Sequence, residues 1–202
     1  AQVAANKAGA GRLEELISAC GRETVLGYMG HIQDAARRLM ESQIERLDPG
    51  QKEFEDELDD GTRIALKLER QGRGVRLDFT GTSGVLGNNF NATPAIVSSA
   101  ALYCFRCLVQ SDIPLNAGVL EPLEIVLPEC FLNPPAASDP AECAAVSAGN
   151  VETSQRIVDT IFGALGAVAA SQGTMNNLLF GNEDFGYYET IAGGAGAGAG
   201  FR

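Results

Sequence analysis

Apolar residues recur at helical spacing near the start of the chain and predict a helical region over residues 12–47. Gly21 separates a short helix, Arg12–Cys20, from a longer one that starts at Glu23. The apolar stripe of the longer helix consists of Val25, Met29, Ile32, Ala36, Leu39, Met40, Ile44 and Leu47. Asp48-Pro49-Gly50 ends the second helix, because proline and glycine disfavour its continuation. The acidic stretch Glu53–Asp60 that follows is interpreted as a solvated connector.

The apolar period then changes from helical to two residues, which is typical of half-buried strands. The alternating apolar positions are Ile64, Leu66, Leu68, Val75, Leu77 and Phe79. With a turn at Gln71–Gly74 they predict a β-hairpin over residues 62–79. Thr93 as N-cap and Pro94 as the first helical residue predict a helix over residues 94–110.

The second half of the chain mixes the same kinds of element. Leu123–Leu127 reads as a strand, and residues 128–148 form a long proline-containing loop of the kind that is usually functional or mobile. A strong apolar stripe predicts a helix over residues 151–169, and two short apolar runs predict a hairpin over residues 177–191. Helices and antiparallel hairpins without a regular strand–helix repeat favour an α+β fold, which we assign to one domain over residues 1–202.

Charge and cysteine content limit the classes of function. The formal net charge of −11 argues against nucleic acid and anionic membranes as partners, because both need a basic surface. No apolar run reaches the length that spans a bilayer. Five cysteines, an odd number, and a start without signal-like architecture fit the reducing cytoplasm and a piece of a larger enzyme. Cys104 and Cys107 form a CxxC inside an apolar helix and are interpreted as ordinary buried thiols.

The start of the helix after residue 149 is the best candidate site. Asn150 precedes backbone N–H groups whose partial positive charge attracts carboxylates and oxyanions. Glu152 and Arg156 fall in the first two turns, where a carboxylate for proton transfer beside a cation suits the polarisation of an amide bond. Because a cation near a helix start opposes the macrodipole, Arg156 is expected to matter more for function than for folding. The alternative is a capped helix in which Arg156 simply pairs with Glu152.

Four segments resemble the hydantoinase B/oxoprolinase family, and in particular its oxoprolinase branch. They read PLNAGVLEP at residues 114–122, GNVETSQR at 149–156, SQGTMNN at 171–177 and GYYETIAGGAGAGAG at 186–200. The resemblance implies an internal portion of a larger hydantoinase B-type domain, in an ATP-dependent amidohydrolase that opens the ring of 5-oxoproline or a hydantoin. It supports Glu152 and Arg156 as catalytic residues. The expected substrate-binding residues are Asn150, Thr153, Gln155, Asn176 and Asn177.

The same resemblance implies the partners. ATP is expected on a separate actin-like domain or subunit of the hydantoinase A type, and the assembly is expected to be an oligomer. His31 is the only histidine, and the histidine-rich metal motif of the family has no match here, so any divalent metal would be held outside this chain. We expect the isolated chain to be inactive. The alternatives are a subunit of an acetone carboxylase-type enzyme and a non-catalytic scaffold or interface module.

Overall fold

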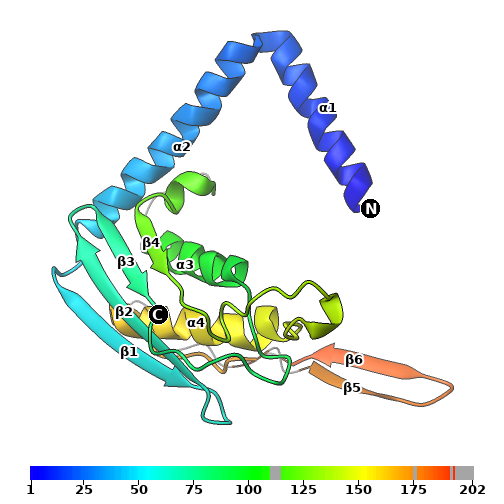
Figure 1. Ribbon diagram of the computed structural model, residues 1–202. Helices are drawn as coiled ribbons and strands as arrows, with labels where there is room; N and C mark the ends of the chain where they lie inside the picture. The colour runs from blue at the N-terminus through cyan, green and yellow to red at the C-terminus, as the bar shows by residue number, and fades with distance from the viewer. Residues whose placement is uncertain (110–114, 175–176, 192, 194–202) are drawn as a thin grey trace.

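The computed structural model describes residues 1–109, 115–174, 177–191 and 193. Its body is a four-stranded sheet with two helices packed beside it, and a helical arm and a β-hairpin project from that body (Figure 1). Helix α4 (Ser154–Leu165) packs on strands β1 (Gln51–Glu57) and β2 (Arg63–Gln71), and α3 (Pro94–Leu108) packs beside α4. The arrangement is the α+β fold that the sequence predicted.

The helical arm consists of α1 (Gln2–Cys20) and α2 (Arg22–Ile44), which meet at Gly21. Gly21 has a φ of 84°, a backbone conformation that glycine adopts without steric cost, so the predicted break is confirmed. Helix α1 begins at Gln2, earlier than predicted, and contributes no buried residue. Its first half is rich in alanine, so good helix formers rather than an apolar stripe account for it.

The main sheet has the strand order β1-β2-β3-β4. Strand β2 (Arg63–Gln71) pairs antiparallel with both β1 (Gln51–Glu57) and β3 (Gly74–Asp78), and β2 and β3 form the predicted hairpin. Strand β4 (Leu123–Val126) pairs parallel to β3, an arrangement that the sequence pattern did not indicate.

The prediction of a solvated connector at Glu53–Asp60 was wrong, because residues 53–57 belong to strand β1. Its charged residues pair in register with the apolar strand β2, for example Asp56 opposite Ile64. An edge strand is paired on one side only and tolerates such charges, which also discourage pairing with another chain. The one large apolar residue, Phe54, lies against Gly163 of α4, where an added Cβ would come within 2.5 Å of the ring.

The core lies between the sheet, α3 (Pro94–Leu108) and α4 (Ser154–Leu165). Its largest fully buried side chains include Phe79, Phe105, Phe131, Met40, Leu77 and Ile161. Thr93 occupies the predicted N-cap position of α3, although its side chain accepts no capping hydrogen bond. Helix α4 ends earlier than predicted, at Gly166 in the left-handed conformation.

The remaining elements are short. Two 3₁₀ turns, η1 (Ala117–Val119) and η2 (Pro140–Glu142), lie in the connections, the second inside the long loop that the sequence predicted. Strands β5 (Asn177–Gly181) and β6 (Gly186–Thr190) form a separate two-stranded sheet. No described helix is both long and apolar enough to cross a membrane.

Replacing Gly118 with alanine should destabilise the protein, because a Cβ there would lie 2.1 Å from the Gln33 carbonyl oxygen in α2. Overpacking against backbone costs about 1–3 kcal/mol. Urea unfolding measures the effect. The matched control is Gly27→Ala in α2, the helix that contains Gln33. Nothing lies within 4 Å of the new Cβ at this position. This substitution should raise stability by up to about 1 kcal/mol, because alanine is the better helix former. Equal effects of the two substitutions would contradict the close approach at Gly118.

Candidate functional site

Helix α4 is preceded by a single π-helical turn, η3 (Gly149–Thr153), whose N-cap is Ala148. The N–H groups of Val151, Glu152 and Thr153 all donate to the Ala148 carbonyl, at 3.1, 2.9 and 3.4 Å. Asn150 therefore lies inside the turn and does not cap the helix, which corrects the sequence interpretation. These three N–H groups were expected to be free to bind an anion, but they are occupied by hydrogen bonds within the turn.

Close packing on the preceding loop holds this turn in place. The Ala148 N–H donates to the Asn89 carbonyl at 2.9 Å, and a Cβ on Gly149 would lie 2.4 Å from the Asn91 carbonyl oxygen. Thr153 is buried, and its hydroxyl donates to the Phe90 carbonyl at 2.6 Å. Thr153 thus joins the helix to the loop.

The predicted site residues divide between two hollows on different faces of the helix. Asn150 and Gln155 line one hollow, of about 610 Å³, which we call the groove. Glu152 and Arg156 line the other, of about 250 Å³, which we call the acidic cavity. The residues that were expected to form a single site therefore line two hollows.

The groove has an apolar wall and a polar rim. The wall is formed by Ile96, Ala100, Tyr103, Val158, Phe162, Val168 and Ala169. The rim is formed by Ser99, Asn150, Ser154, Gln155, Asp159 and Ser171. Apolar surface with a few hydrogen-bonding groups is typical of small-molecule sites.

The rim offers donors to a ligand. Within the described part of the chain the exposed Asn150 side chain makes no hydrogen bond, and Gln155 donates from Nε2 to the Val151 carbonyl at 3.0 Å. The neighbouring Cys107, with a further contribution from burial, raises the pKa of Tyr103. Its phenol is therefore protonated and able to donate at neutral pH.

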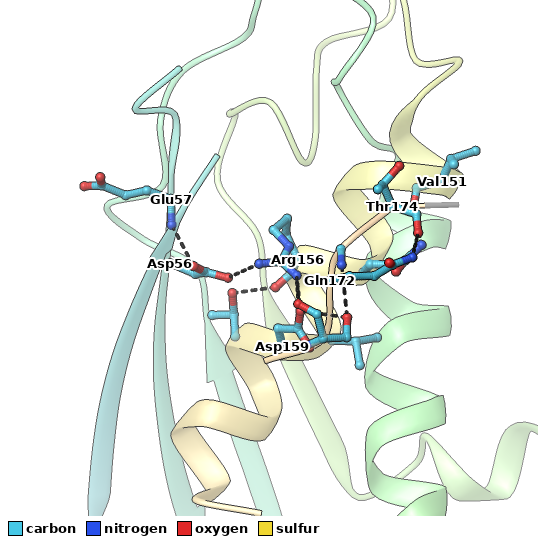
Figure 2. A network of polar contacts seen from close by, with 12 residues as sticks. Asp56, Glu57, Val151, Arg156, Asp159, Gln172 and Thr174 are labelled. Atoms are coloured by element: carbon cyan, nitrogen blue, oxygen red, sulfur yellow. Dashed lines mark hydrogen bonds and ion pairs between the residues drawn. The ribbon is translucent and has the colours of Figure 1, made fainter. Parts of the chain in front are cut away.

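A polar network is centred on Arg156 (Figure 2). Arg156 lines the acidic cavity, whereas Asp159 and Ser171 of the same network line the groove. The guanidinium contacts Asp56 of β1 at 3.4 Å, pairs with Asp159 one turn along the helix, and donates to the Ser171 carbonyl at 3.2 Å. Asp159 is buried and also accepts from the N–H and hydroxyl of Ser171, at 3.1 and 3.2 Å. The network joins β1, α4 and the segment after α4.

Arg156 consequently belongs to a largely buried polar network. Its side chain is only 18% exposed, and its pairing partners are Asp56 and Asp159 rather than Glu152. Gly173, with a φ of 79°, packs against the guanidinium so closely that a Cβ would lie 2.4 Å from Nη2. Through these contacts the Arg156 guanidinium holds β1 and the segment after α4 in position against α4.

The acidic cavity carries an excess of negative charge. Glu57, Asp59, Asp60 and Glu152 line it, against the already paired Arg156. Hydrogen bonds from Thr62 lower the pKa of Asp60, so this carboxylate is ionised at neutral pH. Glu152 accepts a hydrogen bond from the Thr174 hydroxyl. An anionic ligand would be repelled here.

Of the other predicted residues, Asn177 lies away from both hollows. Asn177 begins β5, and its side-chain oxygen accepts from Tyr188 at 3.1 Å and Thr190 at 2.9 Å. It lines neither the groove nor the acidic cavity. Asn176 lies outside the described residues.

The structure assigns no metal or redox role to the cysteines and histidine that it describes. His31 is exposed and packs edge-on against Tyr28, with ring centroids 6.2 Å apart. No group of three or more histidine, cysteine, aspartate or glutamate side chains among the described residues is arranged to hold a metal ion. All five cysteines are free, and burial raises the pKa of Cys104. Cys107 is exposed, so the interpretation of two buried thiols was right for Cys104 alone.

Sequence reasoning missed Asp159, Ser171 and Tyr103. The pairing of Asp159 with Arg156 could have been predicted from the sequence, because residues three apart on a helix are neighbours on its surface. Tyr103 reaches the groove through the packing of α3 beside α4, and Ser171 reaches it through its hydrogen bonds to Asp159.

Comparison with known proteins identifies the family. The family model described as Hydantoinase B/oxoprolinase matches residues 1–202. The chain belongs to the hydantoinase B/oxoprolinase family. It is 46% identical to 5-oxoprolinase 1 of Arabidopsis thaliana over 98% of its length, and 42% identical to 5-oxoprolinase of Dictyostelium discoideum over 100%. In each case it spans only 16% of the relative.

A solved structure shares the fold of this family member. The ATP-dependent caprolactamase from Pseudomonas jessenii superposes with a TM-score of 0.76, covering 94% of this chain and 34% of the caprolactamase chain at 18% identity. This likeness supports the arrangement of helices and strands described above.

Proposed function

We propose that this chain is part of an ATP-dependent amidohydrolase that opens the ring of 5-oxoproline or a hydantoin. The observation that carries the proposal is the alignment of nearly the whole chain with 5-oxoprolinases at 42–46% identity. The caprolactamase that shares the fold is also named as ATP-dependent.

Within this proposal, the groove contacts the cyclic amide. Its apolar wall suits the ring methylenes, while Asn150 and Gln155 supply amide groups for the polar ring atoms. We assign these two residues to substrate binding. Glu152 and Arg156, first expected to be catalytic, face the acidic cavity, where the carboxylate of 5-oxoproline would meet like charge.

The residues of the two hollows do not fit a nucleoside triphosphate. Neither hollow has an unpaired cationic side chain, and the acidic cavity opposes a polyanion. The sequence also holds no GxxxxGK[ST] phosphate loop. We propose that ATP binds to a hydantoinase A-type domain or subunit, and we assign no metal ligand to this chain. Five free cysteines support an assembly that works in the cytoplasm.

The overall reaction that we propose transfers the terminal phosphoryl group of ATP to the lactam oxygen. Water then attacks the activated carbon and the ring C–N bond breaks, which leaves the amine and an acyl phosphate. A second water hydrolyses the acyl phosphate and releases phosphate. The products from 5-oxoproline are glutamate, ADP and phosphate. The groove holds the ring during these steps, and the groups that move phosphate and protons are supplied by the rest of the assembly.

The test uses the intact protein that contains this sequence together with its ATP-binding part. ADP and glutamate should form in equal amounts from ATP and 5-oxoproline, whereas the 202-residue chain alone should form neither. A hydantoin, assayed in parallel, identifies the second substrate class. Absence of ATP hydrolysis driven by either ring, or carboxylation of acetone instead, would refute the proposal.

A further inference from the structure

The π-helical turn before α4 has a backbone form that helices rarely adopt. The Thr153 N–H donates to the Ala148 carbonyl and the Ser154 N–H donates to the Gly149 carbonyl, in each case five residues back along the chain. An α-helix uses carbonyls four residues back, and single π-helical turns inside helices are rare and are frequently found at functional sites. Contacts from outside the turn are therefore needed to hold it in the π form.

The Thr153 hydroxyl makes such a contact. A threonine hydroxyl in a helix often bonds the carbonyl four residues before it, as Thr160 does by donating to the Arg156 carbonyl at 2.7 Å. Thr153 is equally buried, but its hydroxyl donates to the Phe90 carbonyl, 63 residues earlier, at 2.6 Å. Because this bond joins two segments, it stabilises the place of the turn against the loop rather than the helix itself.

Gly149 packs the start of the turn on the same loop. It is buried, and a Cβ there would lie 2.4 Å from the Asn91 carbonyl oxygen, so the close approach requires glycine. The loop is itself fixed by the fully buried Asn91 side chain, which accepts from the Leu86 N–H at 2.8 Å and donates to the Ala145 carbonyl at 3.0 Å. The turn thus packs against a loop whose conformation is held by its own hydrogen bonds.

The π form determines how the two amide side chains of the groove are placed. Asn150 lies inside the turn, and Gln155 follows it at the start of α4. The Gln155 amide donates to the carbonyl of Val151, which is also in the turn, at 3.0 Å. An α-helical turn holds one residue fewer than a π-helical turn, so a change to the α form would move Asn150 relative to Gln155.

We propose that Thr153 is a positioning residue for binding of the cyclic amide. Its hydrogen bond to Phe90 keeps the turn in the π form that presents Asn150 to the groove. Thr153 lines neither the groove nor the acidic cavity, so it acts through Asn150 and not by contact with the ring. This inference rests on the proposed function, because it takes the groove as the site of the ring.

The test is Thr153→Val in the intact, ATP-hydrolysing protein, which removes the hydroxyl and keeps the size of the side chain. The Michaelis constant for 5-oxoproline should rise about three- to tenfold with little change in kcat, because loss of one hydrogen bond lowers the fraction of protein whose turn is ready to bind. Thr153→Ser keeps the hydroxyl and should keep a normal Michaelis constant.

Thr160→Val is the matched control. Thr160 lies in the same helix and is equally buried, but its hydroxyl bonds only its own helix and it does not line the groove. Its substitution should leave the Michaelis constant normal. A merely structural role of Thr153 would make the two valine variants alike, each with lower stability and an unchanged Michaelis constant.

A double-mutant cycle shows whether Thr153 acts through Asn150. Asn150→Ala should raise the Michaelis constant by itself, and the double variant should show less than the product of the two single increases. Independent effects, or a Thr153→Val that behaves like Thr160→Val, overturn this inference alone and leave the groove as the ring site. A normal Michaelis constant in Asn150→Ala instead refutes the groove, and absence of ATP-driven ring opening in the unmodified protein refutes the proposed function. The inference fails with either.

Discussion

Replacing Asp159 with alanine should lower the free energy of unfolding by about 3 kcal/mol, because it leaves a largely buried Arg156 without its main partner. The same change removes the acceptor for the N–H and hydroxyl of Ser171. Loss of these bonds should also free the segment that follows α4. Urea unfolding of the two proteins measures the difference.

The matched control for Asp159→Ala is Glu15→Ala in α1. The Arg12–Glu15 pair has the same spacing and order as Arg156–Asp159, but its side chains are 82% and 68% exposed, against 18% and 6%. Exposed pairs contribute about 0–1 kcal/mol. If both substitutions cost the same, burial of the Arg156 network does not contribute to stability and our description of it is wrong.

Substituting Asn150 with aspartate should raise the Michaelis constant of the intact enzyme for 5-oxoproline by about tenfold or more, which corresponds to ~1.4 kcal/mol. The physical reason is repulsion between the new carboxylate on the groove rim and the carboxylate of the substrate. An uncharged hydantoin lacks this repulsion, so its Michaelis constant should change little. Stability should also change little, because Asn150 is exposed and does not cap the helix.

Asn182→Asp is the matched control for that substitution. Asn182 lies in the β5–β6 turn and accepts from the N–H groups of Asp184 and Phe185, bonds that an aspartate oxygen can also accept. It adds the same charge away from the groove. Equal increases in the Michaelis constant for both variants would show an effect of net charge rather than of position.

Local sequence patterns predicted the α+β fold because most of its elements carry their own signal. The alternation in β2 and β3 and the Gly21 break depend on residues close together in the chain. Strand β1 was missed because six of its seven residues are polar, and its strand state comes from pairing with β2. Parallel pairing of β4 likewise depends on a partner far away in sequence.

The candidate site was predicted less well for the same reason. The sequence predicted a helix that starts near residue 150, and the structure places Asn150 and Gln155 of this region beside the groove. It could not show that Asp56, 100 residues earlier, pairs with Arg156. Nor could it show that contacts with the Asn89–Asn91 loop make the first turn π-helical, which determines the faces on which Asn150 and Glu152 lie.

The most direct test of the account compares the Michaelis constants for 5-oxoproline of Asn150→Asp and Glu152→Gln, measured on the intact, ATP-hydrolysing protein. The account predicts a large increase for Asn150→Asp and nearly unchanged kinetics for Glu152→Gln, because the groove, and not the acidic cavity, contacts the ring. Loss of activity in Glu152→Gln with normal kinetics in Asn150→Asp would contradict it and place the reaction in the acidic cavity.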